Sequence, residues 1–401
     1  MGLSMDLIGS PSLKNILEEK MTGRERILAV LNKQVPDRIP VTFFVQEEYL
    51  SWFYPERKNI SRVSDAVDCA RHYGFDIITR DNKYTKPYWL NKSYPNWEVQ
   101  EETWIENDIY YRKTAIKTPG GTLDQIETAP NDPRILKGVH FHMQDYLLKS
   151  VESFEIFKKY FPEIDKRELE ERRERARYSK NIIGDLGITC PWGIGGVYNS
   201  VSSYRNIQEL LMDPYIQPDF YHDLMDFFTK WIVKDYQIMT ETEFDALGIQ
   251  GNIANGALMG DDFFSQYILP YEKRISDTIR SGGKFSIYHN CGYAHNLYKS
   301  YRELGIDVWE TVAPSPMGDN NLREARNFFG EDLILSGNLD QVNFLKRATP
   351  DEIRETVKEI MCQGKKGGAF LFSASDYLEP ETPEENIKAA VSAAIEWGGL
   401  K

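Results

Sequence analysis

The stretch FSIYHNCGYAHNLY, residues 285–298, places a histidine and a cysteine two residues apart, at His289 and Cys291. Its first half is typical of a buried strand, and residues i and i+2 of a strand point to the same face. An imidazole nitrogen and a thiolate sulfur that meet at one point are ligands that zinc prefers. The pair therefore indicates a metal site. The alternative is a core histidine, satisfied in its hydrogen bonds, beside a buried thiol.

Other polar and aromatic residues follow or flank strand-like runs. The segment TCPWGIGGVYNS, residues 189–200, lacks the GxGxxG dinucleotide fingerprint, and we interpret it as a loop that turns Trp192 and Tyr198 toward a substrate. Asp245 and Asn252 flank the run FDALGIQ and are candidates for orienting that substrate. Asp245 could equally be a solvated residue that caps its neighbours.

These residues need a scaffold, and the sequence predicts one in which buried strands alternate with helices. Capping boxes, for example at Thr22 and Glu25, begin several of the helical segments. Eight strand-like runs in this rhythm favour an α/β fold of the (β/α)8 TIM barrel type, in which chemistry takes place at the carboxyl ends of the strands. The runs are 38–45, 75–79, 181–188, 244–250, 284–290, 307–311, 332–337 and 369–374.

One stretch breaks this rhythm. Polar and apolar residues alternate over residues 96–129, and a Gly-Gly pair marks a turn within it. We expect an antiparallel β-hairpin inserted after the second strand, at 90–130. The predicted organisation is a single barrel domain over residues 1–401, with a helical extension at its N-terminus, over residues 1–36.

Composition restricts the partners and the compartment. The 401 residues carry a formal net charge of -13, which argues against nucleic acid as a partner, since phosphate binding needs clustered Lys and Arg. No apolar run of about 18 residues occurs, so no membrane segment is expected. Four cysteines without a CxxC pair favour a reducing, cytoplasmic location. These cysteines are Cys69, Cys190, Cys291 and Cys362.

Several segments together resemble the uroporphyrinogen decarboxylase superfamily. They are TGRERILAVLNKQVPDRIPV, HNCG followed by LGIDVWE, GNLD, and PETPEENIKAAVSAA. More narrowly, the chain resembles the corrinoid-dependent methyltransferase branch, of the O-demethylase type. Decarboxylases of the superfamily hold a substrate with many carboxylates through arginines of an N-terminal loop. Here aromatic and acidic residues follow the first strand instead, which favours the methyltransferase branch.

The resemblance implies a metal-ligand set. Thiol-methylating members bind zinc through a His-x-Cys pair and a distant cysteine; the pair corresponds to His289 and Cys291, but Asp376 stands where the second cysteine would be. We expect Asp376 as the third ligand, with Glu310, at the end of the sixth strand, as the substitute. Asp376 could also be only a loop residue. A carboxylate in place of a thiolate keeps the metal harder and more Lewis acidic, which suits an oxygen-bearing substrate.

The implied reaction is demethylation of a small methoxylated substrate, which we expect to be aromatic. The methyl group would pass to the cobalt of a corrinoid (cobalamin) carried by a partner protein, with Zn2+ in the enzyme. Phe44, Tyr49 and Trp52 would line a pocket for the ring, although such residues could serve only for packing. A homodimer is a further option. The alternatives are methyl transfer from a methylcobamide to a thiol or tetrahydrofolate, and a uroporphyrinogen decarboxylase-like tetrapyrrole enzyme. A member of the superfamily that only binds a partner or a tetrapyrrole, without catalysis, is a further alternative.

Overall fold

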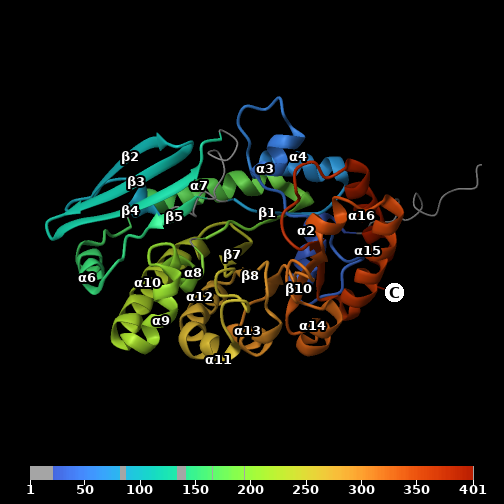
Figure 1. The fold of residues 1–401 in the computed structure, drawn as a ribbon. Coiled ribbons are helices and arrows are strands. Elements are labelled where there is room, and N and C mark those ends of the chain that lie inside the picture. Colours follow the sequence, from blue (N-terminus) through green and yellow to red (C-terminus); the bar gives the residue numbers. More distant parts are fainter. Residues whose placement is uncertain (1–20, 82–86, 133–140, 165, 194, 401) are drawn as a thin grey trace, which may run out of the picture.

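Parallel strands flanked by helices make up most of the molecule (Figure 1). The computed structural model describes residues 21–81, 87–132, 141–164, 166–193 and 195–400. Five strands form one parallel sheet in the order β11-β10-β9-β8-β7, and β1 pairs in parallel with β6. The bounds are β1 Ile77–Thr79, β6 Gly187–Thr189, β7 Ala246–Gln250, β8 Phe285–His289, β9 Val308–Glu310, β10 Ile334–Leu339 and β11 Phe370–Ala374.

Single parallel bridges extend these two sheets toward each other. Trp192, in the loop after β6, pairs with Gly248 of β7, and Val41 pairs with Phe372 of β11. The segment around Val41 meets β1 through a side chain, because the Val41 N–H donates to Asp76 Oδ2 over 3.1 Å. The result is an α/β arrangement like that of a TIM barrel; closure of the strands into one ring stays a prediction.

Most helices lie around the outside of the strands (Figure 1). Their buried residues are largely apolar. Capping boxes begin α2 at Thr22 and α15 at Thr349, as the sequence predicts. The main helices are α2 Gly23–Leu31, α3 Glu47–Phe53, α4 Ser64–Tyr73, α5 Tyr88–Asn91, α6 Val151–Tyr160, α7 Lys166–Ile183, α8 Val197–Ser202, α9 Ile207–Ile216, α10 Pro218–Thr240, α11 Asp261–Phe263, α12 Leu269–Ser281, α13 Tyr298–Leu304, α14 Leu322–Phe329, α15 Pro350–Gly364 and α16 Glu384–Trp397.

One cluster of buried apolar side chains extends across all seven parallel strands. Each of the seven parallel strands contributes one residue, and α2 adds Ile27, Val30 and Leu31 to the same cluster. Helix α2 therefore covers the end at which the strands begin, and the opposite end is left for chemistry. The strand residues of this cluster are Ile78, Ile188, Ala246, Ile287, Val308, Ile334 and Leu371.

A separate antiparallel sheet projects from one side of the molecule (Figure 1). We expected a hairpin at 90–130, but the insertion has four strands in the order β2-β3-β4-β5 and extends beyond residue 130. The fourth strand is short and polar, which is why the alternating pattern did not reveal it. The bounds are β2 Glu98–Glu106, β3 Ile109–Thr118, β4 Gly121–Pro130 and β5 His142–Asp145.

Two of the eight expected strands differ from the prediction. The run 38–45 forms only isolated bridges, and Pro40 within it lacks the N–H that a regular ladder needs. In the run 181–188, helix α7 continues to Ile183, and β6 begins only at Gly187. Gly184 between them has a φ of 53°, which ends the helix. Most of the expected N-terminal extension, residues 1–20, lies outside the described residues. Within the described chain, no helix combines the length and apolar character needed to cross a membrane.

Candidate metal centre

Three potential metal ligands converge at the carboxyl ends of the parallel strands. His289 is the last residue of β8, Cys291 follows two residues later, and Asp376 lies two residues beyond β11. Their ligand atoms all lie within 4.8 Å of one another. Cys291 and Asp376 are far apart in the sequence. They come close together in the fold because β8 and β11 belong to one parallel sheet and end at the same edge of it. The strand-end geometry expected for the His-x-Cys pair is therefore present.

Glu310 ends the neighbouring strand β9 and lies behind the imidazole. Its Oε1 is 3.0 Å from His289 Nδ1, and both side chains are buried. A carboxylate can only accept, so Nδ1 carries the proton, and Nε2 is left as the free lone pair. Nε2 faces Asp376, whose Oδ1 is 3.9 Å away. Metal-binding histidines are commonly held by such a carboxylate on their other nitrogen. Glu310 therefore has the position of a residue that orients His289, rather than that of a third ligand.

The electrostatics of the cluster match a site built for a cation. Burial lowers the pKa of His289, but Cys291, Glu310 and Asp376 together raise it to well above its usual value. Burial raises the pKa of Asp376, and the neighbouring His289 only partly opposes this. Acidic groups thus surround one imidazole that would be protonated when no metal is bound. A divalent ion would replace that proton, as metal binding to a histidine requires the neutral ring.

The donor set fits zinc. One imidazole nitrogen, one cysteine sulfur and one carboxylate oxygen are all ligands that zinc accepts, and three protein ligands leave the fourth position open, as in catalytic zinc sites. Mg²⁺ is a harder cation that prefers oxygen ligands, and it would not select a site with a thiolate. His289, Cys291 and Asp376 are therefore the residues that would hold the ion.

Aromatic side chains form a wall beside this cluster. The Trp192 ring lies perpendicular to the His289 ring with centroids 5.3 Å apart, and the Phe44 ring lies 6.3 Å from it. Phe44 also contacts Trp192 at 6.0 Å and Tyr377 at 6.3 Å. Sequence reasoning selected Phe44 and Trp192 but missed Tyr377, which directly follows Asp376 and could have been found from that adjacency.

Asp245, a predicted substrate residue, lies at the wrong end of the molecule, and that prediction is wrong. It precedes β7, five residues before Gln250, which pairs with His289. At ~3.3 Å per strand residue the separation along the strand is roughly 16 Å. Its carboxylate binds Arg24, with Oδ2 2.8 Å from Nη1, and accepts from the Thr189 N–H over 3.0 Å. The carboxylate ties α2 to the strands and lies far from the metal ligands.

The remaining predicted substrate residues lie in other surroundings. Tyr49 is buried and its hydroxyl is 2.8 Å from that of Tyr73, so it belongs to the core. Trp52 is 38% exposed and packs on Tyr49, and within the described residues neither ring contacts Phe44, Trp192 or His289. Tyr198 is buried against Phe263. Asn252 follows β7 at the correct end, two residues beyond the register partner of His289.

Arg80 is a site residue that the sequence analysis missed. It directly follows β1, is 4% exposed, and its Nη2 donates to Glu310 Oε2. Its guanidinium lies 5.4 Å from the ring centroids of both Phe44 and Trp192. The signal was the abrupt charged pair Arg-Asp at the carboxyl end of an apolar strand, where a barrel places its functional groups.

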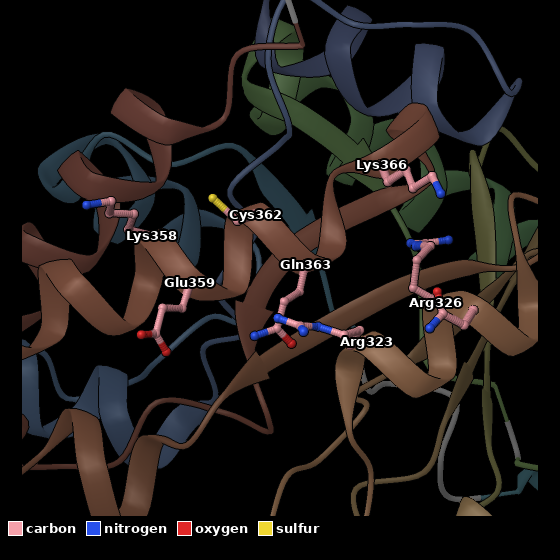
Figure 2. Close-up of a pocket in the computed structure, with 8 residues that line it drawn as sticks. Arg323, Arg326, Lys358, Glu359, Cys362, Gln363 and Lys366 are labelled. Carbon is pink, nitrogen blue, oxygen red and sulfur yellow. The ribbon is translucent and has the colours of Figure 1, made fainter.

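A basic hollow of about 510 Å³ lies elsewhere, between α14 and α15 (Figure 2). Arg323, Arg326, Lys358 and Lys366 line it together with Glu359. The Arg326 side chain donates to the carbonyl oxygens of Gly330 and Leu333, which precede β10. The hollow therefore lies toward the end at which the strands begin, away from the metal ligands, and Arg326 serves to hold the chain there.

Comparisons with known proteins agree with this fold. A methyltransferase from Methanosarcina mazei has a similar structure, with a TM-score of 0.66 and 16% identity over 94% of this chain and 99% of that chain. A methylcobamide:CoM methyltransferase (MtbA) of Methanosarcina acetivorans is 28% identical over 43% of this chain and 48% of its own length. A uroporphyrinogen decarboxylase of Coxiella burnetii is 22% identical over 53% of this chain and 56% of its own. The chain spans about half the length of the curated relatives it matches.

The family assignment comes from a match over more than half of the chain. Residues 175–397 match the uroporphyrinogen decarboxylase (URO-D) family. This range includes the strands β6 to β11 and three of the residues at the cluster, His289, Cys291 and Asp376. The family that the sequence motifs indicated is confirmed, and the chain belongs to the uroporphyrinogen decarboxylase (URO-D) family.

Proposed function

We propose that the protein is a metal-dependent methyltransferase that removes the methyl group from a small methoxylated, aromatic substrate. The methyl group passes to the cobalt of a corrinoid carried by a partner protein that docks over the carboxyl ends of the strands. The observation that carries this proposal is the meeting of a His–Cys–Asp ligand set with a wall of aromatic rings.

The chemical difficulty of demethylating an ether is its leaving group. An alkoxide or phenoxide departs only when its developing negative charge is stabilised as the C–O bond breaks. Zinc, when bound, supplies Lewis acidity at this point. Cys291 and Asp376 would hold the ion with one fewer thiolate than a His-Cys-Cys set, and the hard carboxylate favours an oxygen-bearing substrate over a thiol.

The chain's own groups would perform the remaining tasks. Glu310 keeps the proton of His289 on Nδ1, so that Nε2 points at the ion. Phe44, Trp192 and Tyr377 offer apolar faces against which an aromatic ring can lie, and they limit the access of water to the reacting centre.

Methyl transfer to a thiol is the second candidate. It is supported by the relatives, since three of them are named methylcobamide:CoM methyltransferases, from Methanosarcina acetivorans, Methanosarcina mazei and Methanosarcina barkeri. The same ligand set would then activate a thiol as the methyl acceptor. A decarboxylase function has less support, because the segment that follows Val45 is rich in acidic and aromatic residues and would not attract a polyanionic tetrapyrrole.

The two directions are separated by the optical spectrum of the cobalt. The zinc-loaded protein is incubated with a reduced corrinoid protein and a panel of methoxyarenes, and loss of the Co(I) absorption is followed. The same enzyme is then incubated with a methylated corrinoid protein and a panel of small thiols. Demethylation predicts a change in the first mixture only. A change in the second mixture only would replace the proposal by thiol methylation, and no change in either would refute both.

A further inference from the structure

Arg80 is a buried cation with one strong hydrogen-bond acceptor. Its Nη2 binds Glu310 Oε2, and that carboxylate is its ion-pair partner in the described part of the chain. Its Nε and Nη1 find no oxygen or nitrogen acceptor there, and the Cys190 thiol interacts with the guanidinium. Burial raises the pKa of Cys190 to about 12, so this neighbour stays neutral. The guanidinium therefore requires an accepting oxygen of Glu310 on its own side.

The two oxygens of Glu310 have different partners. Oε2 faces Arg80, and Oε1 accepts from His289 Nδ1 over 3.0 Å. Arg80 and His289 thus bind opposite ends of one carboxylate, and the rings of Phe44 and Trp192 lie against the guanidinium at 5.4 Å each. These contacts leave Glu310 little freedom to rotate or to swing toward the metal ligands.

We infer that Arg80 is a positioning residue: it fixes the orientation of Glu310, and through it the Nδ1–H form of His289 that presents Nε2 to the metal. The inference rests on the proposed function, in that His289 is taken as a ligand. Arg80 also neutralises the charge of Glu310, so that the carboxylate stays an acceptor for the imidazole and is not drawn to the ion as an extra ligand. With His289, Cys291 and Asp376 as its protein ligands, a bound zinc ion would keep a fourth position for substrate.

The substitution Glu310→Gln tests this because an amide has one accepting and one donating end. With Arg80 present, the amide oxygen must face the guanidinium, so its NH2 faces His289 Nδ1. That nitrogen must then accept, the ring proton moves to Nε2, and the metal ligand is lost. In the double variant Arg80→Met and Glu310→Gln, the amide is free to turn, its oxygen can accept from Nδ1–H, and Nε2 is available again.

The first measurement is the affinity for Co²⁺, followed by its visible absorption. Glu310→Gln is expected to weaken binding by about 10- to 100-fold, the range typical for groups that orient a metal-binding histidine. The double variant is expected to regain at least about tenfold of that loss. Asp213→Asn is the matched control, because it breaks another buried arginine–carboxylate pair, with Arg205, and should leave Co²⁺ affinity unchanged.

The second measurement does not depend on the stability of the double variant. Selective ¹⁵N labelling of the six histidines reports the tautomer of His289 in metal-free protein at alkaline pH. Glu310→Gln is expected to move the proton from Nδ1 to Nε2. A double variant no better than Glu310→Gln, or an unchanged tautomer in the single variant, would overturn the inference about Arg80. A wild-type protein without Co²⁺ affinity would instead overturn the proposed function itself.

Discussion

Replacing Asp376 by asparagine removes one negative charge from the cluster and leaves its shape nearly unchanged. The ligand atoms of His289, Cys291 and Asp376 lie within 4.8 Å of one another, so an ion among them would be close to each. A pair of unit charges ~4 Å apart at an effective dielectric constant of about 20 interacts by about 4 kcal/mol, or roughly three decades in affinity. The ion carries two charges, but burial already penalises the Asp376 carboxylate, as its raised pKa indicates. We expect zinc affinity to fall by about 10³-fold.

The assay is competition for zinc against a chromophoric chelator. Asp376→Cys should restore most of the affinity, because it replaces the carboxylate by another anionic ligand. Asp245→Asn is the matched control: the same chemical change at the opposite end of the strands should leave zinc affinity unchanged. Wild-type zinc affinity in Asp376→Asn would refute the assignment of Asp376, and Glu310 would have to be reconsidered as the third ligand.

Three further predictions concern protons and the aromatic wall. Because the pKa of metal-free His289 is raised, zinc affinity should increase with pH, by about tenfold per unit for each proton displaced until the ring is neutral, as measured by calorimetry in several buffers. Burial raises the pKa of Glu272 to about 7, so the stability contribution of this one carboxyl is fully present below its unfolded-state pKa near 4.3 and is lost as pH rises through 7. Glu272→Gln should remove this loss and be up to about 3 kcal/mol more stable than wild type at alkaline pH, measured by urea unfolding. Trp192→Ala should raise KM for a methoxyarene about tenfold with unchanged zinc content, while Trp52→Ala should change neither; equal effects of the two would contradict the placement of the ring-binding wall.

Much of the fold follows from local patterns. The strands β7, β8, β9, β10 and β11 lie within two residues of the predicted runs, because short apolar segments between capped helices have few other ways to be buried. The exception at residues 38–45 has a local cause, since Pro40 interrupts the ladder. The exception at 181–188 arises because its first apolar residues suit a helix as well as a strand. They belong to α7, which ends at Ile183, and Gly184 with its positive φ follows directly.

Only the parts of the site that depend on residue spacing and on the end of a single strand could be predicted from the sequence. His289 and Cys291 share a strand end, and this local geometry was sufficient to place them. Asp245 directly precedes β7, and a residue at the beginning of a barrel strand lies at the end opposite to the chemistry, so its local position already argued against a role in the site. Arg80 acts through its contact with Glu310, 230 residues away in the chain. Such a pairing depends on how the strands are assembled in three dimensions, and no local sequence pattern reveals that arrangement.

We propose that His289, Cys291 and Asp376 hold one catalytic zinc ion, since their ligand atoms lie within 4.8 Å of one another. X-ray absorption at the zinc edge of the purified, zinc-loaded protein tests it most directly, because it counts sulfur and lighter ligands separately. We expect one zinc per chain, with a single sulfur ligand at about 2.3 Å and nitrogen or oxygen ligands at about 2.0–2.2 Å. A spectrum with two or more sulfurs, with none, or a protein that takes up no stoichiometric zinc would contradict it.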